Sequence, residues 1–183
     1  MRRLAIRSWS ATAAARRAPD AEAVACAPHD VVTSRTSWGE LQRASRVAAR
    51  KLVLAGVGKG TRVGFLCGNR PEWLPIAFGA LRIGAVLVPL STLLKPVELR
   101  ACLQAAAVQF LIAVHEFRGN RLLDELPAPR SAELPALRQV WDFTDILDRS
   151  GTELDRVDAL IGTVGPLVTI ALGWWVLDET LSA

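Results

Sequence analysis

Cysteine and histidine are scarce in this sequence of 183 residues. The cysteines are Cys26, Cys67 and Cys102, and the histidines are His29 and His115. No two cysteines have the C-x-x-C spacing, so the sequence predicts neither a disulfide framework nor a zinc site. We expect Cys67 and Cys102 to act as small buried hydrophobic side chains in a reducing compartment.

The residue patterns of nucleophilic catalysis are also missing. Two histidines and no nucleophile-elbow sequence give no basis for a Ser-His-Asp or Cys-His arrangement. His115 ends a predicted strand, where a capping or hydrogen-bonding role is the default and a general base is the alternative. We assign no catalytic residue.

Long basic runs are absent as well. The formal net charge of +4 comes mainly from dispersed arginines, with no run of five basic residues and no interleaved aromatics, so we expect no nucleic-acid partner. Residues 1–18 contain five arginines and no acid, and they lack the apolar core of a secretory signal. They favour the Arg/Ala-rich first helix of a cytoplasmic protein, with a transit peptide as the alternative.

What the sequence does contain is an alternation of helix and strand patterns. Ser37 and Glu40 have the spacing of a capping box, which predicts the start of a helix that ends at Gly56 and Gly58. Further helices are expected over residues 70–84 and from residue 96, and short apolar strands over 62–67, 85–89 and 110–114. This order predicts an α/β fold with a partial parallel sheet and covering helices. Three strands leave exposed edges, which predict that part of the sheet is missing and that the chain self-associates.

Two glycine-containing segments invite a phosphate-loop interpretation. Residues 56–61 do not match a phosphate loop, because Gly60 and not Ser or Thr follows Lys59. The turn also leads from a helix into a strand, whereas a phosphate loop leads from a strand into a helix. Residues 150–152 are followed by Glu153 and Asp155, whose charges would repel a triphosphate. We interpret the first segment as a helix stop and turn, and the second as linker.

Four segments together resemble the opening of a known family. They are SWGEL at 37–41, GVGKGTRV at 56–63, NRPEW at 69–73 and LRIGAVLVPL at 81–90. Their order and separations resemble those of the adenylate-forming (AMP-binding) acyl-CoA synthetase superfamily over residues 19–126.

The resemblance implies a function that this chain does not carry out alone. A complete member of the family activates a carboxylic acid with ATP to an acyl-adenylate and passes it to coenzyme A, with Mg²⁺ assisting. In that family the four segments are scaffold, and the motifs that hold ATP and coenzyme A follow later and cannot be matched here. We therefore expect no cofactor, metal or small-molecule site in this chain, and no activity.

The last part of the chain has a different composition. Residues 127–156 are expected to be a linker, and Ala159 to Leu177 carry no charge. As a helix this stretch would span about 28 Å, near the ~30 Å of a bilayer core. Residues 163–181 resemble a helix of the EamA-type drug/metabolite transporter family, with Asp178 in place of the usual glycine. We predict a transmembrane helix within residues 157–183, with a buried helix of a soluble protein as the alternative.

These expectations lead to two hypotheses. In the first, the chain is a truncated or fused reading frame that joins an inactive synthetase fragment to a transporter remnant. In the second, it is a membrane-anchored interaction protein. One span cannot enclose a transport pathway, which argues against a working transporter. The chain would be membrane-associated if the helix inserts and cytoplasmic otherwise.

Overall fold

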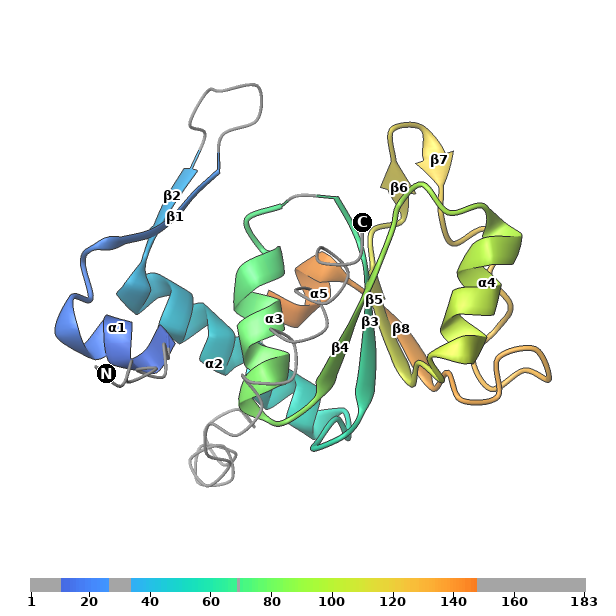
Figure 1. Cartoon of the computed structure of the whole chain (residues 1–183), viewed down its shortest axis with the longest axis horizontal. Helices are drawn as coiled ribbons and strands as arrows, with labels where there is room; N and C mark the ends of the chain where they lie inside the picture. The colour runs from blue at the N-terminus through green and yellow to red at the C-terminus, as the bar shows by residue number, and fades with distance from the viewer. Residues whose placement is uncertain (1–10, 27–33, 69, 148–183) are drawn as a thin grey trace, which may run out of the picture.

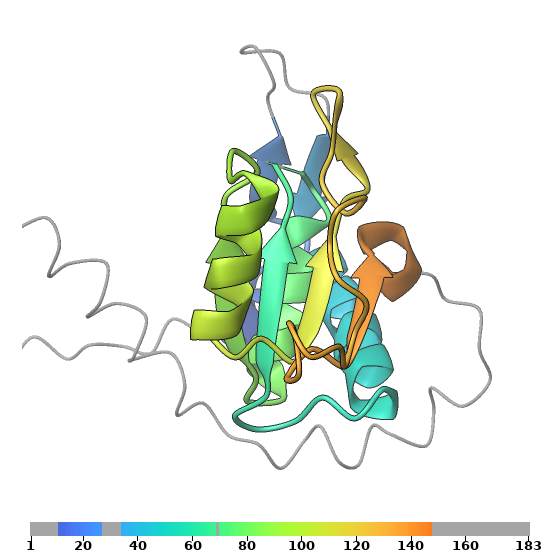
Figure 2. The same ribbon diagram turned by 90° about the vertical axis from the view of Figure 1, so that its right-hand side faces the viewer.

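The computed structural model describes residues 11–26, 34–68 and 70–147, and its centre is a parallel sheet (Figure 1). The sheet contains β3 (Arg62–Leu66), β4 (Val86–Leu90), β5 (Phe110–Ala113) and β8 (Gln139–Asp142). Their spatial order is β4-β3-β5-β8, and all three pairings are parallel. Figure 2 shows neighbouring strands of this sheet running in the same direction. The α/β fold with a parallel sheet is therefore confirmed.

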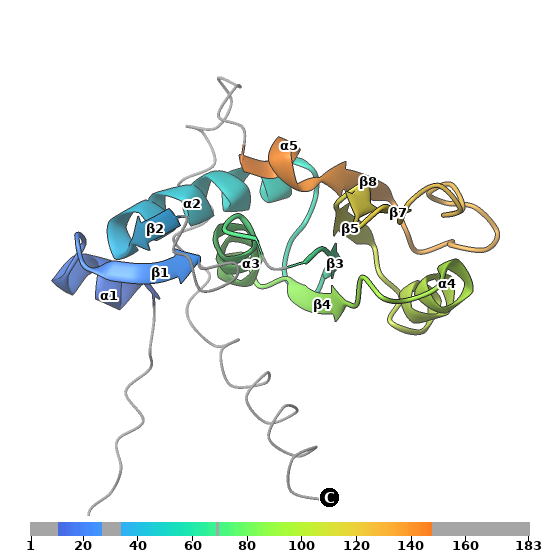
Figure 3. The same ribbon diagram turned by 90° about the horizontal axis from the view of Figure 1, so that it is seen from above.

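Helices cover both faces of the sheet. The helices are α1 (Ala11–Arg17), α2 (Trp38–Leu54), α3 (Trp73–Arg82), α4 (Pro96–Ala105) and α5 (Phe143–Leu147). Seen from above, α2, α3 and α5 lie on one side of the sheet and α4 lies on the other (Figure 3). Two antiparallel hairpins complete the described part: β1 (Glu22–Cys26) pairs with β2 (Ser34–Ser37), and β6 (Glu116–Phe117) pairs with β7 (Asn120–Arg121).

The capping box fixes the start of α2 as predicted. The Glu40 N–H donates to Ser37 Oγ over 3.3 Å, and the Ser37 N–H donates to Glu40 Oε2 over 2.8 Å. These hydrogen bonds pair two backbone N–H groups that would otherwise have no partner at the first turn of a helix. At the other end the helix stops before Gly56, which adopts a positive φ of 87°.

Each central strand contributes to two cores, one on either face. Val63 and Phe65 of β3 pack with α2 and α3, whereas Leu66 packs with α4. In β5, Phe110 and Ile112 face the first core, and Leu111 and Ala113 face the second. Because side chains alternate across a strand, burial on both faces requires a continuous apolar run.

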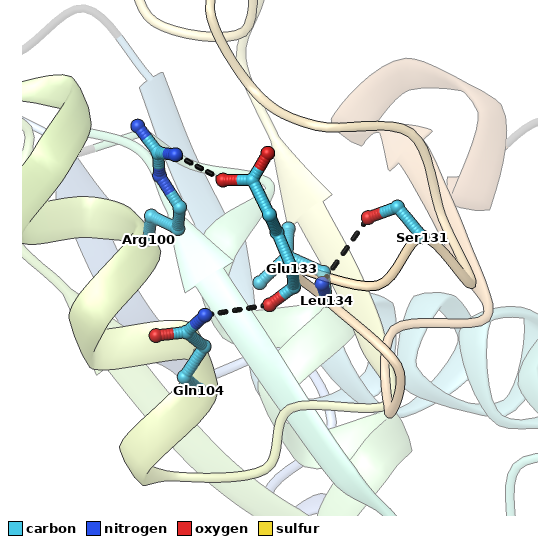
Figure 4. Close-up of polar contacts among 5 residues, drawn as sticks. All are labelled: Arg100, Gln104, Ser131, Glu133 and Leu134. Atoms are coloured by element: carbon cyan, nitrogen blue, oxygen red, sulfur yellow. Dashed lines mark hydrogen bonds and ion pairs between the residues drawn. The ribbon is translucent and has the colours of Figure 1, made fainter.

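The segment after β7 is more ordered than its proline-rich sequence predicts. The Arg100 guanidinium of α4 pairs with the Glu133 carboxylate, and Gln104 Nε2 donates to the Glu133 carbonyl oxygen over 2.6 Å (Figure 4). The nearby Leu134 and Leu137 are buried in the core beneath α4. These contacts lead the chain into β8, a fourth strand that the sequence pattern did not predict.

Two of the predicted features lie outside the described residues. They are the hydrophobic helix within 157–183, with its resemblance to an EamA-type transporter helix, and the Ser150–Thr152 segment. Among the helices of the described ranges, none is both long and apolar enough to cross a membrane.

Candidate functional site

The carboxyl ends of the parallel strands lie at one edge of the sheet. The chain passes from β3 to β4 on one side, whereas β5 and β8 lie on the other side of β3. In open parallel sheets, ligands bind in the crevice where the strand order reverses in this way. The fold therefore places a candidate site beyond Leu66 of β3 and Ala113 of β5.

Polar side chains follow both strands at this edge. After β3, Arg70 Nε lies 3.4 Å from Glu72 Oε2, so these two charges face each other. After β5, His115 is exposed, and its carbonyl oxygen accepts a hydrogen bond of 3.0 Å from the Leu122 N–H. No described contact joins the His115 ring to the Arg70–Glu72 pair, so the edge holds polar groups without a catalytic arrangement.

An aromatic ring packs against the chain just after β3. Phe117, in the short β6-β7 hairpin that follows β5, packs its ring against Gly68, which follows β3. A Cβ atom at position 68 would lie only 2.3 Å from Phe117 Cε2. A side chain at position 68 would therefore displace the Phe117 ring.

Cys67 is unreactive in these surroundings. The side chain is partly buried and packs against the α2/α3 core. Burial raises the pKa of the Cys67 thiol to about 11, with Glu72 also raising it and Arg70 opposing the rise. Because the thiolate is the nucleophilic form, this thiol is a poor nucleophile at neutral pH. Cys102 is also partly buried, so both side chains are less enclosed than the sequence predicts.

A second hollow lies away from the sheet edge. A cavity of about 300 Å³ opens between the β1-β2 hairpin and the first turns of α2 and α3, and an adjoining one of about 330 Å³ shares Glu40, Ala44 and Leu147 with it. The walls combine apolar side chains such as Leu41 and Leu74 with charged ones.

The charged groups of this hollow already have partners. Ser37 donates two hydrogen bonds to the Glu40 carboxylate, which lowers the pKa of Glu40. Arg35 pairs with Glu22 across the hairpin. Glu72 faces Arg70. The hollow is therefore a concave, partly apolar surface with few polar groups left to recognise a ligand.

The glycine-rich turn at 56–61 is structural, as interpreted from the sequence. Gly56 and Gly60 have φ angles of 87° and 79°, which glycine adopts without strain. The Gly60 N–H donates to the Gly84 carbonyl oxygen, and the Thr61 hydroxyl accepts from the Gly58 N–H. The turn lies at the amino end of β3, opposite the candidate edge.

Two other features of the candidate regions could not be predicted from the sequence pattern. The contact between Gly68 and Phe117 joins residues 49 apart in the chain, and the hollow combines elements that no local motif connects. Within the described ranges, no three His, Cys, Asp or Glu residues lie close enough together to hold a metal ion.

Comparison with known proteins matches most of the chain to one enzyme family and to several relatives. The profile of the AMP-binding enzyme family matches residues 11–163. Acyl-CoA ligase SID4 of Ajellomyces capsulatus is 30% identical over 141 residues, which cover 75% of this chain and 24% of the relative. The putative acyl-CoA synthetase YngI of Bacillus subtilis is 28% identical over 162 residues, covering 75% and 29%.

Solved structures agree on the fold. A fatty acyl-CoA synthetase of Mycobacterium tuberculosis superimposes with a TM-score of 0.65 at 23% identity, covering 78% of this chain and 28% of that protein. The chain thus spans about a quarter of the length of the curated relatives it matches.

Proposed function

This chain belongs to the AMP-binding enzyme family, and we propose on this basis that it forms the opening part of a ligase that activates a carboxylic acid with ATP and transfers the acyl group to coenzyme A. The observation that carries the proposal is the family match over residues 11–163. The names of the relatives SID4 and YngI, an acyl-CoA ligase and a putative acyl-CoA synthetase, support the class of reaction.

The role of this part is scaffolding. The four segments that carry the resemblance cap α2, turn into β3, lead into α3 and pack α3 against β4. At the sheet edge, Phe117 packs against Gly68 and Arg70 faces Glu72. These residues organise a core and leave few groups free for chemistry.

We propose that the described residues do not themselves hold ATP or Mg²⁺. The glycine-rich turn lies at the amino end of β3, and its N–H groups at Gly58 and Gly60 already donate within the protein. No cluster of carboxylates for a cation is present in the ranges that the structure describes. We therefore propose that binding of nucleotide and metal depends on residues beyond those described here.

Carboxylate-dependent exchange between ATP and pyrophosphate tests this proposal. The purified 183-residue chain is incubated with ATP, Mg²⁺, labelled pyrophosphate and a panel of fatty and aromatic acids, with a full-length acyl-CoA synthetase as the positive control. We expect no exchange above the acid-free background. Exchange that rises with one of the acids would show that the chain contains a complete activating site.

A second proposal concerns the uncharged stretch from Ala159 to Leu177. We propose that it anchors the chain in a membrane, so that the α/β part acts as an interaction module outside the bilayer. The stretch has the length of a span, although the AMP-binding enzyme match overlaps its start.

Flotation of cell membranes in a density gradient separates insertion from aggregation. We expect the chain to float with membranes, and Leu167→Asp combined with Val168→Asp to abolish flotation because two charges in a span are costly. Recovery of the intact unmodified chain in the soluble fraction without detergent would remove the anchor.

A further inference from the structure

A guanidinium group that has no acidic partner among the described residues lies where α1, α2 and α3 meet. Arg82, in the last turn of α3, is partly buried and points between the other two helices. Its Nη2 lies 3.4 Å from Thr12 Oγ1 of α1 and 3.4 Å from Ser45 Oγ of α2. Both contacts are long for hydrogen bonds, so the guanidinium is only loosely held.

The hydrogen-bonding capacity of Arg82 is incompletely used. Its Nε–H is buried and has no partner among the described residues. A guanidinium has five N–H donors, and a buried donor left unpaired destabilises a fold. The side-chain oxygen of Gln42, one turn before Ser45 on α2, is the other buried polar atom without a partner in the described ranges.

The charge at this junction is uncompensated as well. No carboxylate of the described ranges forms a salt bridge with Arg82, whereas Arg46 of α2 is close enough to repel it. Burial first, and Arg46 second, lower the pKa of Arg82. The carboxyl end of α3 offers only a partial negative charge. A single bridging water would satisfy the free Nε–H but would leave the repulsion between Arg46 and Arg82 uncompensated.

We propose that this junction binds an oxyanion, a phosphate or a carboxylate, held by Arg82 and Arg46 with the hydroxyl of Thr12, while the Ser45 hydroxyl donates to the Gln42 carbonyl oxygen and accepts from Arg82. The fork of N–H donors on a guanidinium matches two oxygens of such an anion. Partial exposure of Arg82 leaves the junction accessible to a small ion or to an acidic side chain of another polypeptide segment. This site is separate from the sheet edge and does not depend on the ligase reaction.

Thermal unfolding of the full chain with inorganic phosphate tests the site. The midpoint is measured in sodium chloride and in sodium phosphate at equal ionic strength for the unmodified protein, Arg82→Met and Arg62→Met. Arg62 is an exposed arginine at the start of β3, so its variant controls for the general stabilisation that phosphate gives to folded proteins.

We expect a saturable phosphate response in the unmodified protein and Arg62→Met that exceeds the response of Arg82→Met by about 2–4 °C. Equal responses of all three proteins would overturn the proposal and leave a water as the sufficient partner. If Arg82→Met does not fold, Arg46→Gln decides by the same criterion, because Arg46 is exposed and its replacement removes a guanidinium from the site without opening the core.

A parallel series with sodium acetate distinguishes the two sources of the anion. A response to acetate as large as that to phosphate supports an acidic side chain as the natural occupant, and a response to phosphate alone supports a free phosphate group. If neither anion gives an Arg82-dependent response, the site does not exist.

Discussion

At the scale of single residues, close packing of α3 on α2 depends on one glycine. A Cβ atom at Gly79 would lie 2.8 Å from Ala48 Cβ and from the Ser45 carbonyl oxygen. These neighbours include backbone atoms, which cannot move without shifting α2.

We therefore expect Gly79→Ala to lower the free energy of unfolding by about 1–3 kcal/mol, the usual result of overpacking a core. Urea denaturation followed by circular dichroism measures the change. Gly58→Ala is the matched control, since a Cβ there meets no atom within 4 Å. Equal stability of the two variants would show that α2 and α3 pack less closely than described.

The thiol of Cys67 gives a residue-scale prediction for alkaline pH. Burial raises its pKa from 9.0 to about 11 in the folded protein, whereas in the unfolded chain the thiol titrates near its ordinary value. Between these values the unfolded state has lost the proton and the folded state retains it, so stability falls as pH rises from 9 to 11.

Urea denaturation at several pH values in this interval tests the linkage. We expect the stability of the unmodified protein to fall more steeply than that of Cys67→Ala, and Cys102→Ala to keep the steep fall. An identical pH dependence in all three proteins would contradict a raised pKa of Cys67 in the folded state.

At the scale of elements, the outer edge of the sheet at β4 is protected by a proline. The Val86 N–H donates to the Thr61 carbonyl oxygen, so it points toward β3. Backbone groups alternate in direction along a strand, so those of Leu87 and Pro89 point away from β3. Pro89 has no N–H to offer, which limits pairing with another strand. We therefore expect β4 to contribute less to the predicted self-association than an edge strand that keeps all its N–H groups.

Replacing Pro89 with valine restores the missing donor, and we expect Pro89→Val to increase self-association. Analytical ultracentrifugation over a range of concentrations measures the effect. Ser91→Val adds the same side chain at an exposed position just after β4 and is the matched control. If both variants associate equally, the added apolar surface and not the restored N–H is the cause.

Local patterns predicted some elements of the fold and missed others for physical reasons. The Ser37–Glu40 capping box and the apolar strands were visible because each lies within a few residues. β8 was not visible in the sequence, because its four residues have polar ends and no clear period. Its strand conformation depends on pairing with β5 and on the Arg100–Glu133 contact. The junction at Arg82 likewise depends on three helices meeting, which no spacing reveals.

At the scale of the whole molecule, apolar surface lies exposed where α4 begins. Leu93 is 80% exposed and Val97 is 69% exposed, next to the edge strand β4. Under the proposal that this chain is the opening part of a larger ligase, the rest of the enzyme covers this surface.

We expect Leu93→Ser combined with Val97→Ser to raise the soluble concentration of the isolated chain and to change the free energy of unfolding by less than about 0.5 kcal/mol. Light scattering and urea denaturation measure the two effects. Leu99→Ser, at a buried position on the same helix, should instead destabilise the protein. Unchanged solubility of the double variant would mean that this surface does not limit it.

The order of the strands has a consequence for synthesis on the ribosome. β3 is made first, β4 pairs with β3 on one side, β5 pairs with β3 on the other, and β8 pairs with β5. Each strand made after β3 therefore meets a neighbour that has already been made, and only β3 waits for a later partner. Once Ala113 has left the exit tunnel, the nascent chain outside the ribosome contains all residues of a three-stranded sheet. Folding can therefore follow translation strand by strand.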